Sequence, residues 1–205
     1  MKTIAIISQK GGCGKTTLAT HLAVFATQKG QAVVLVDLDK QRSASNWYKQ
    51  RSIDSELAQV ASPAGQLPQI LKKSQEGGAD IVIIDTAPYA DKDATIAARM
   101  ADYVLVPCRP EFFDMVAMPS TVQLLKLTET PFCIVLNGCP PGNTTQEARE
   151  ALRQQGFPVS DLSISHRQGI KHSSRAGETL SEFDPQNTAV GEIAAIYEFL
   201  KEQVG

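Results

Sequence analysis

The sequence predicts a doubly wound α/β fold, in which helices cover both faces of a mainly parallel sheet. Short apolar runs alternate with segments of helical periodicity, the order that right-handed strand–helix–strand crossovers produce. Most of these runs are apolar throughout, as in strands buried on both faces of a parallel sheet. Polar residues directly follow several runs, at the edge where such sheets bind ligands. The length of 205 residues suits one domain, residues 1–205, with a sizeable core.

The strands are expected where Val, Ile and Leu gather in short runs. In chain order these runs are Thr3–Ser8, Ala32–Asp37, Ile81–Asp85, Tyr103–Pro107, Phe132–Asn137 and Val159–Ile164.

The helices are expected between these strands. Gly30 and Gly156 stand where helix-ending glycines are common, and Thr144–Glu147 resembles an N-terminal capping region. The predicted helices are Lys15–Gln28, Gln66–Gln75, Asp93–Met100, Met115–Leu127, Thr145–Gln155 and Val190–Gln203. Ser62–Pro68 and Cys139–Asn143 are predicted to be loops.

Composition argues against several classes of protein. No apolar run approaches the ~20 residues that span a bilayer, and the N-terminus lacks the layout of a signal peptide. The net charge of −2 gives no general attraction to nucleic acid, so DNA binding would need a local basic patch. The scattered cysteines, expected to be apolar filler or surface thiols, are Cys13, Cys108, Cys133 and Cys139. We therefore expect a soluble cytoplasmic protein.

The segment Gln9–Thr17 has the composition of a phosphate-binding loop. It follows the first predicted strand and precedes a helix, so that backbone N–H groups and the helix dipole can converge on an anion. Lys15 would neutralise the β and γ phosphates, and the Thr16 hydroxyl would complete the shell of a Mg²⁺ ion. Gln9 departs from the ordinary pattern Gly-x-x-x-x-Gly-Lys-[Ser/Thr], and the loop carries a second lysine, Lys10.

Three aspartates follow predicted strands: Asp37, Asp39 and Asp85. Because residues two apart in an extended chain point the same way, Asp37 and Asp39 are expected to face the same side. A strand-end Asp beside a phosphate loop commonly orients Mg²⁺ through water, whereas a single Asp often only caps the next turn. Three such positions around one glycine loop favour a nucleotide site over a chance glycine-rich turn.

These motifs together resemble those of the deviant Walker-A ATPases. The matching segments are Lys10–Thr17, Val36–Gln41 and Ile83–Pro88, with a looser match of Pro107–Asp114 to the family's Pro-x-x-Pro-x-x-x-Asp loop. Within this group the chain looks most like the short ParA-type plasmid partition ATPases, which lack an N-terminal DNA-binding extension. The resemblance covers essentially the full length. It implies a P-loop NTPase fold and hydrolysis of ATP to ADP and phosphate, slow unless a partner stimulates it.

The resemblance also implies roles for single residues. Lys10 would be the signature lysine that reaches across an ATP-sandwich homodimer to the partner's phosphates. A second lysine adds little to Lys15 on one phosphate chain, but across a two-fold axis it neutralises the other nucleotide. Asp39 would help to activate the attacking water, Asp37 would support the metal side, and Asp85 would orient Mg²⁺.

The nucleotide would be held by the loop and by two downstream residues. The loop residues are Gly11, Gly12, Cys13, Gly14, Lys15, Thr16 and Thr17. Pro110 belongs to the family's proline loop, and Asn137 is placed either to read the adenine edge or to cap the turn at Gly138. The family usually has Pro where this chain has Lys40, so this loop would be more mobile or Lys40 would add a phosphate contact.

A basic segment late in the chain suggests a DNA-binding surface. Arg167, Lys171 and Arg175 recur every four residues and would share one helical face, although Gly169 weakens the helix. The window Ser163–Gly177 contains no Asp or Glu. Such a row would bind DNA phosphates in a sequence-independent, salt-sensitive way, and the alternative is a solvated helix face.

The C-terminal helix argues against a membrane partner. MinD-like relatives end in a basic amphipathic helix, whereas Ala189–Gly205 carries three glutamates and one lysine. Trp47 and Tyr48 would either contact a partner or fill the core, and core burial is expected. The same is expected of a set of residues in the last helix: Ile193, Ile196, Tyr197 and Leu200.

The function implied is an ATP-dependent DNA-segregation switch associated with the nucleoid. ATP and Mg²⁺ would drive dimerisation and nonspecific DNA binding, and a ParB-like centromere-binding adaptor would stimulate hydrolysis and release the DNA. Two alternatives stay open. One is a ParA-like ATPase that positions another cargo, such as chemotaxis clusters. The other is a metal-cluster ATPase of the nitrogenase-reductase type, for which Cys108 is a candidate ligand without a paired cysteine nearby.

Overall fold

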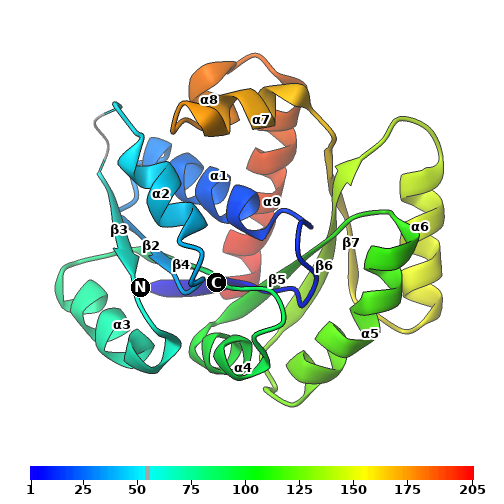
Figure 1. The fold of residues 1–205 in the computed structure, drawn as a ribbon, viewed down its shortest axis with the longest axis horizontal. Helices are drawn as coiled ribbons and strands as arrows, with labels where there is room; N and C mark the ends of the chain where they lie inside the picture. The colour runs from blue at the N-terminus through cyan, green and yellow to red at the C-terminus, as the bar shows by residue number, and fades with distance from the viewer. Residues whose placement is uncertain (54–55) are drawn as a thin grey trace.

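The computed structural model describes residues 1–53 and 56–205, which contain a seven-stranded sheet in the order β3-β2-β4-β1-β5-β6-β7 (Figure 1). The strands are β1 Lys2–Ile6, β2 Val33–Asp37, β3 Leu57–Ala61, β4 Ile81–Asp85, β5 Tyr103–Cys108, β6 Phe132–Cys139 and β7 Val159–Ser165. Every pairing between these strands is parallel. The predicted α/β fold is therefore confirmed.

The middle of the sheet is apolar on both faces, which explains the continuous apolar runs in the sequence. β1 lies between β4 and β5, with Ile4 opposite both Ile83 and Tyr103. Every residue of β4 and β5 is buried. Strands of this kind need helices on both sides to exclude water.

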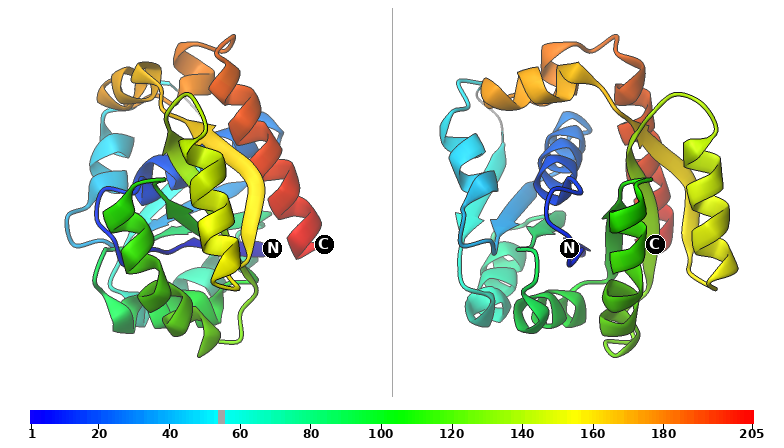
Figure 2. Two further views of the ribbon diagram at one scale, coloured as in Figure 1. Left: turned by 90° about the vertical axis from the view of Figure 1, so that its right-hand side faces the viewer. Right: turned by 45° about the vertical axis from the view of Figure 1, so that its right-hand side comes forward.

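Two groups of helices cover the two faces (Figures 1 and 2). One core is formed with α1 Lys15–Gln28, α2 Ser43–Lys49 and α9 Thr188–Val204. The opposite core is formed with α3 Leu67–Glu76, α4 Asp91–Met100, α5 Phe112–Lys126 and α6 Thr144–Gln154. The sheet is thus the middle layer of three.

Two short helices, α7 Gln168–Arg175 and α8 Leu180–Phe183, lie together at the top of Figure 1, beyond α1. Ile170 of α7 packs against the core that contains α1 and α9. A Cβ added to Gly169 would lie 2.9 Å from Cδ1 of Leu180. The glycine that weakens α7 in the sequence is therefore what lets α7 approach α8 closely.

Three elements, β3, α2 and α8, were not predicted from the sequence. β3 is an edge strand in which only Leu57 is buried, so it lacks a continuous apolar run. α2 and α8 have only 7 and 4 residues, too few for helical periodicity to appear. The loop predicted over Ser62–Pro68 is also wrong. A 3₁₀ turn over Ala64–Gln66 runs directly into α3, and Pro68 sits in the first turn, where its missing N–H costs nothing.

The packing predictions are confirmed. The four cysteines are free and buried. Trp47 is buried in the core that contains α1, and Tyr48 packs at its edge. The core residues predicted for the last helix are buried: Ile193, Ile196, Tyr197 and Leu200. Among the described residues, no helix has the length and apolar character needed to cross a membrane.

His21 fastens α8 to α1. Its Nε2 accepts a hydrogen bond from the backbone N–H of Leu180 at 3.1 Å, so Nδ1 carries the proton and donates to the carbonyl of Thr17 at 2.8 Å. Burial lowers the pKa of the imidazole to about 4, although the bond to Thr17 opposes this change. Neutral His21 therefore joins α8 to the helix that follows the phosphate-binding loop.

Acidification is expected to weaken the fold through His21. The unfolded chain takes up a proton near pH 6.5, whereas the folded chain does so only near pH 4. The contribution is complete above pH 6.5 and is lost as the pH falls towards 4, at most about 3 kcal/mol in the free energy of unfolding. Urea unfolding at pH 7 and pH 5 measures this loss, with His21→Gln as the non-titrating control. An equal pH dependence in both proteins would contradict the expectation.

Candidate nucleotide-binding site

The phosphate-binding loop connects β1 to α1, and glycines shape it. Gly12 and Gly14 have φ angles of +78° and +93°, in the left-handed region. A Cβ added to Gly14 would collide with Nδ2 of Asn137. This amide, near the end of β6, donates a hydrogen bond to the carbonyl of Cys13 at 2.8 Å. Asn137 therefore braces the loop in this structure, a role that the sequence did not indicate.

The two lysines of the loop have different surroundings. The Nζ of Lys15 donates to the backbone carbonyl of Lys10 at 2.9 Å, and Lys15 is only 6% exposed. Lys15 lines the cavity described below. The side chain of Lys10 is half-buried and is not among the lining residues. One loop thus presents one lysine to the cavity and keeps the other outside it.

Thr16 joins the loop to the end of β4. Its hydroxyl donates to Oδ2 of Asp85 at 2.7 Å. Asp85 is fully buried, and its Oδ1 has no hydrogen-bond partner among the described residues. Burial raises the pKa of this carboxyl to about 7, an effect that the Thr16 bond opposes and the nearby Asp37 reinforces. A cation at the free oxygen would stabilise the charged form.

Asp37 and Asp39 have different surroundings, although both act electrostatically on Asp85. Oδ1 of Asp37 accepts the N–H of Asp39 at 3.0 Å, and Oδ2 accepts the N–H and hydroxyl of Ser45 at 2.9 and 2.7 Å. These bonds fix the turn into α2. Asp39 lies beyond the end of β2, where strand alternation no longer sets its direction, and it lines the cavity. Lys40 is exposed and lines a separate cavity of about 330 Å³.

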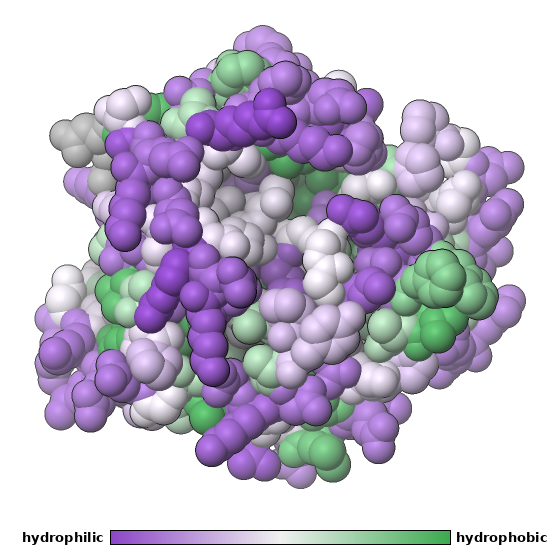
Figure 3. Space-filling view, in the orientation of Figure 1, coloured by the Kyte–Doolittle hydropathy of each residue, from purple (hydrophilic) through white to green (hydrophobic). Residues whose placement is uncertain are grey.

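A cavity of about 890 Å³ opens at the loop. Figure 3 shows it as a hollow near the centre of the face, below α7, with hydrophilic side chains around it. From the loop and α1 it is lined by Gly11, Gly12, Gly14, Thr16, Thr17 and Thr20. Among the described lining residues, Lys15, Arg109 and Arg175 are cationic and Asp39 is the one acid. This balance of charge suits a ligand with several negative charges.

These features fit a nucleoside phosphate with Mg²⁺. The N-cap residue of α1 is Gly14, which has no side chain to satisfy the first N–H groups of the helix, so these groups are left for an anion. Lys15 supplies the balancing charge. Thr16 and Asp85 supply oxygen ligands of the kind that Mg²⁺ prefers, including the unpartnered Oδ1 of Asp85.

The proline loop after β5 lies beside the cavity. Arg109 lines the cavity, whereas Pro110 is buried and is not among the lining residues. Asp114 is buried, and its Oδ1 has no hydrogen-bond partner among the described residues. Burial raises the pKa of Asp114, with Glu111 adding to this effect and Lys10 and Arg109 opposing it. The charge of Lys10 therefore favours the charged form of Asp114.

Helices α2 and α7 contribute side chains that the sequence analysis did not assign to the nucleotide. α2 and the residue after it bring Asn46, Trp47 and Gln50, and α7 brings Ser174 and Arg175. α2 was not predicted, and α7 is distant from the loop in sequence. No local pattern could have indicated either contribution.

The predicted row of basic residues is only partly helical. Arg167 is the extended residue before α7, with φ of −130°, and its Nη2 donates to Oγ1 of Thr188 at 3.2 Å. Lys171 and Arg175 lie on α7 and are exposed. The three residues therefore do not share one helical face, because the helix begins after Arg167.

Comparison with known proteins agrees with this geometry. The chain matches the family model of the CobQ/CobB/MinD/ParA nucleotide binding domain over residues 4–180. It is 31% identical over 199 residues to the maintenance of carboxysome distribution protein A of Gloeobacter kilaueensis, across 93% of this chain and 89% of that protein.

Two solved structures share the fold. The septum site-determining protein MinD of Pyrococcus horikoshii, complexed with Mg-ADP, superposes with a TM-score of 0.81 at 18% identity, over 100% of this chain and 97% of that one. A plasmid partition protein of Borrelia burgdorferi superposes with a TM-score of 0.69 at 21% identity, over 98% of each chain.

The family match includes every element that builds the cavity. Residues 4–180 span the phosphate-binding loop, the three strand-end aspartates and α7. The resemblance to the ParA and MinD proteins that the loop indicated is thereby confirmed. The chain belongs to the CobQ/CobB/MinD/ParA family of nucleotide-binding domains.

Proposed function

We propose that this chain is an ATP-dependent switch that positions a cargo on DNA. The observation that carries the proposal is the contrast between two lysines of one loop: Lys15 lines the cavity and Lys10 does not. A cation beside the cavity, yet not lining it, is suited to a nucleotide held by a second copy across a two-fold axis. Binding of ATP would thereby drive formation of a homodimer.

Catalysis of hydrolysis to ADP and phosphate would come from positioning the attacking water and stabilising the phosphate charge, without a covalent enzyme intermediate. Lys15 and the N–H groups at the start of α1 would neutralise the phosphates, and Asp39 would orient the attacking water. Lys10 of the partner subunit would add charge when the dimer forms. Mg²⁺, held by Thr16 and Asp85 and supported through the Asp37 turn, would offset the remaining phosphate charge.

The exposed basic side of α7 supports nonspecific binding to DNA, and hence association with the nucleoid. Lys171 is exposed there, and Arg167 lies just before the helix. A single copy offers few cations, whereas a dimer doubles them, which makes DNA affinity dependent on ATP.

The cargo is either a protein body or a DNA molecule, and the relatives favour the first. The relative at 31% identity is named for carboxysome distribution, so we propose that the chain positions a large protein assembly through an adaptor. Plasmid partition with a ParB-like adaptor is the second candidate, supported by the fold shared with the Borrelia burgdorferi partition protein. Deletion of the gene distinguishes the two candidates. Loss of a positioning protein disturbs the distribution of the protein assembly in the cell, whereas loss of a partition protein causes loss of the plasmid.

ATP is expected to raise the affinity for DNA of arbitrary sequence, and Lys171→Glu is expected to remove most of that gain. The variant replaces a phosphate contact with a repulsive charge in each subunit, so the slope of log affinity against log salt should fall by roughly one per lost contact. Lys72→Glu, on α3, is the matched charge-reversal control. Fluorescence anisotropy with ATP, ADP and no nucleotide measures the effect. A DNA affinity that is the same with and without ATP would refute the proposed ATP-dependent switch.

A further inference from the structure

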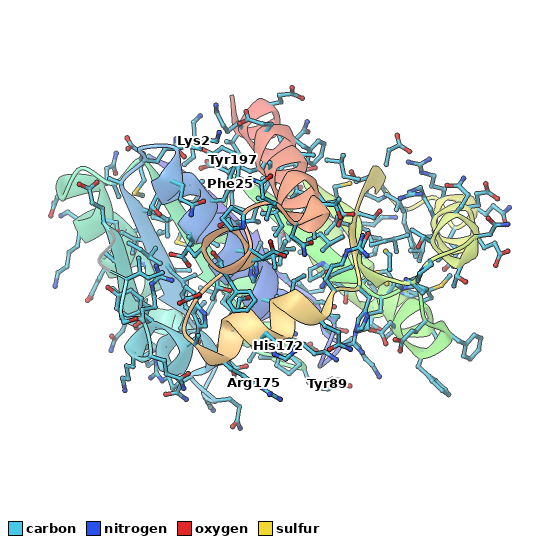
Figure 4. All side chains as sticks on the ribbon, turned by 90° about the horizontal axis from the view of Figure 1, so that it is seen from above. Lys2, Phe25, Tyr89, His172, Arg175 and Tyr197 are labelled. Carbon is cyan, nitrogen blue, oxygen red and sulfur yellow. The ribbon has the colours of Figure 1, made fainter. Side chains whose placement is uncertain are left out.

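α7 brings a cation to the phosphate cavity from a distant part of the chain. Arg175, the last residue of α7, lines the same cavity as Lys15 and Thr17. Figure 4 shows Arg175 and His172 projecting from the same side of α7. Arg175 makes no ion pair with any described residue, so its charge is available to a ligand in the cavity.

A buried ion pair holds the segment that follows α7. Nη2 of Arg51 lies 2.7 Å from Oε1 of Glu182, and Nη1 lies 3.1 Å from Oε2, so the pair is bidentate. Both side chains are almost fully buried, at 3% and 9% exposure. Nη1 of Arg51 also donates to the carbonyl of Gly177 at 3.0 Å. A paired, hydrogen-bonded guanidinium in this position fixes geometry more firmly than an exposed pair could.

Related contacts join the turn after α7 to the end of α2. The guanidinium of Arg51 stacks on the ring of Trp47 at 4.9 Å, and Nε1 of Trp47 donates to the carbonyl of Glu178 at 3.2 Å. Gly177 has φ of +71°, and an added Cβ would lie 2.6 Å from the backbone of Gln50 and of Arg51. The turn after Arg175 is therefore packed directly on the end of α2, which leaves the end of α7 little freedom.

We propose that Arg175 contacts the phosphates of a bound nucleoside triphosphate and that the Arg51–Glu182 pair holds it at the cavity. The assignment rests on the proposed nucleotide site and moves Arg175 from the predicted DNA row to that site. Lys171, one turn earlier, does not line the cavity. α7 would thus carry a nucleotide-facing end beside a DNA-facing side.

The arrangement favours a polyanionic ligand. The contacts of Gly177 fix the backbone beside Arg175 before the ligand arrives, so little backbone freedom is lost on binding. Together with Lys15 and Arg109 this arginine brings three positive charges to one cavity, against the single carboxylate of Asp39 among the described lining residues. Charge-assisted hydrogen bonds from a guanidinium to phosphate oxygens are the strongest that a side chain offers here.

The affinity of alanine and lysine variants tests the contact. Titration calorimetry with Mg²⁺ and the non-hydrolysable analogue AMP-PNP is expected to show about tenfold weaker binding for Arg175→Ala. The affinity of Arg175→Lys for AMP-PNP should lie between that of Arg175→Ala and that of the natural protein. Lys49→Ala removes a charge from the exposed end of α2 that does not line the cavity, and it should stay within about twofold, as expected for a screened surface charge.

Lys15→Ala distinguishes a failure of the Arg175 contact from a failure of the nucleotide site. If Lys15→Ala loses AMP-PNP while Arg175→Ala binds like the natural protein, the contact is overturned and the nucleotide site stands. If Lys15→Ala also binds like the natural protein, the nucleotide site itself fails.

A double-variant cycle tests the role of the ion pair. Glu182→Gln should weaken AMP-PNP binding, yet Glu182→Gln combined with Arg175→Ala should bind no more weakly than Arg175→Ala alone, since the pair acts through Arg175. Arg51→Lys keeps the charge but not the bidentate fork, and it repeats the test if Glu182→Gln does not fold. Additive losses would overturn the positioning role.

Discussion

Lys15→Ala is expected to abolish ATP hydrolysis and to weaken nucleotide binding by at least about 30-fold, since truncating one partner of a buried charge pair costs about 2 kcal/mol or more. In this structure the ammonium group is already gathered into the loop by the carbonyl of Lys10, at 2.9 Å. It therefore needs only to exchange that carbonyl for phosphate oxygens when the nucleotide binds. A shorter side chain leaves the phosphate charge to the backbone N–H groups alone.

Steady-state ATPase assays and calorimetry check this result, with Lys29→Ala as the matched control. Lys29 follows the same helix, and its Nζ lies 5.2 Å from the centroid of the Phe25 ring, remote from the cavity lining. Circular dichroism establishes that both variants fold. Substantial ATPase activity in Lys15→Ala would mean that the cavity at the loop is not the catalytic site.

The phosphate-binding loop and its partner Asp85 could be predicted because their signals are local. A glycine-rich turn between an apolar run and a helix has one common structural outcome, and an aspartate at the end of a neighbouring strand falls at the same sheet edge. The parallel register that sets Asp37 opposite Asp85 follows from the same alternation of strands and helices. Local pattern and global fold agree here.

The other side of the cavity could not be predicted, because it depends on pairings between distant residues. Arg51 and Glu182 are 131 positions apart, and His21 and Leu180 are 159 apart. Neither pair carries a periodic or motif-like signal. Arg175 was assigned to DNA because its spacing fits a helical row, whereas its place beside the cavity depends on how the turn after α7 packs on the end of α2.

Asp37 and Asp39 show how far residue spacing can predict the surroundings of a side chain. The spacing of Asp37 and Asp39 predicted one shared orientation, but it did not predict the different partners of the two carboxylates. β2 ends at Asp37, as predicted, and the carboxylate of Asp37 accepts hydrogen bonds from Ser45 at the start of α2. Asp39 is thereby released to line the cavity. The predicted strand also ends at Asp37, so the difference between the two carboxylates comes from the turn beyond the strand, whose hydrogen bonds the spacing does not indicate.

Lys10→Ala is expected to prevent ATP-dependent dimerisation while nucleotide binding survives at reduced affinity. The substitution keeps the backbone carbonyl that holds Lys15, so the loop of the single subunit stays intact. What it removes is the cation that would neutralise the nucleotide of the second copy, where two phosphate chains approach each other across the two-fold axis. Asp114 would also lose the attraction that opposes the rise of its pKa.

Light scattering with ATP, ADP and no nucleotide measures the outcome, under conditions in which the natural protein dimerises with ATP. Lys10→Arg keeps the charge and should retain part of the dimer, which distinguishes lost charge from a damaged loop. Because dimerisation would also double the basic surface of α7, Lys10→Ala should lose ATP-dependent DNA binding together with the dimer. If Lys10→Ala still dimerises with ATP, Lys10 acts only within its own subunit. The proposed ATP-dependent switch, in which Lys10 acts on the partner's nucleotide, would then be wrong.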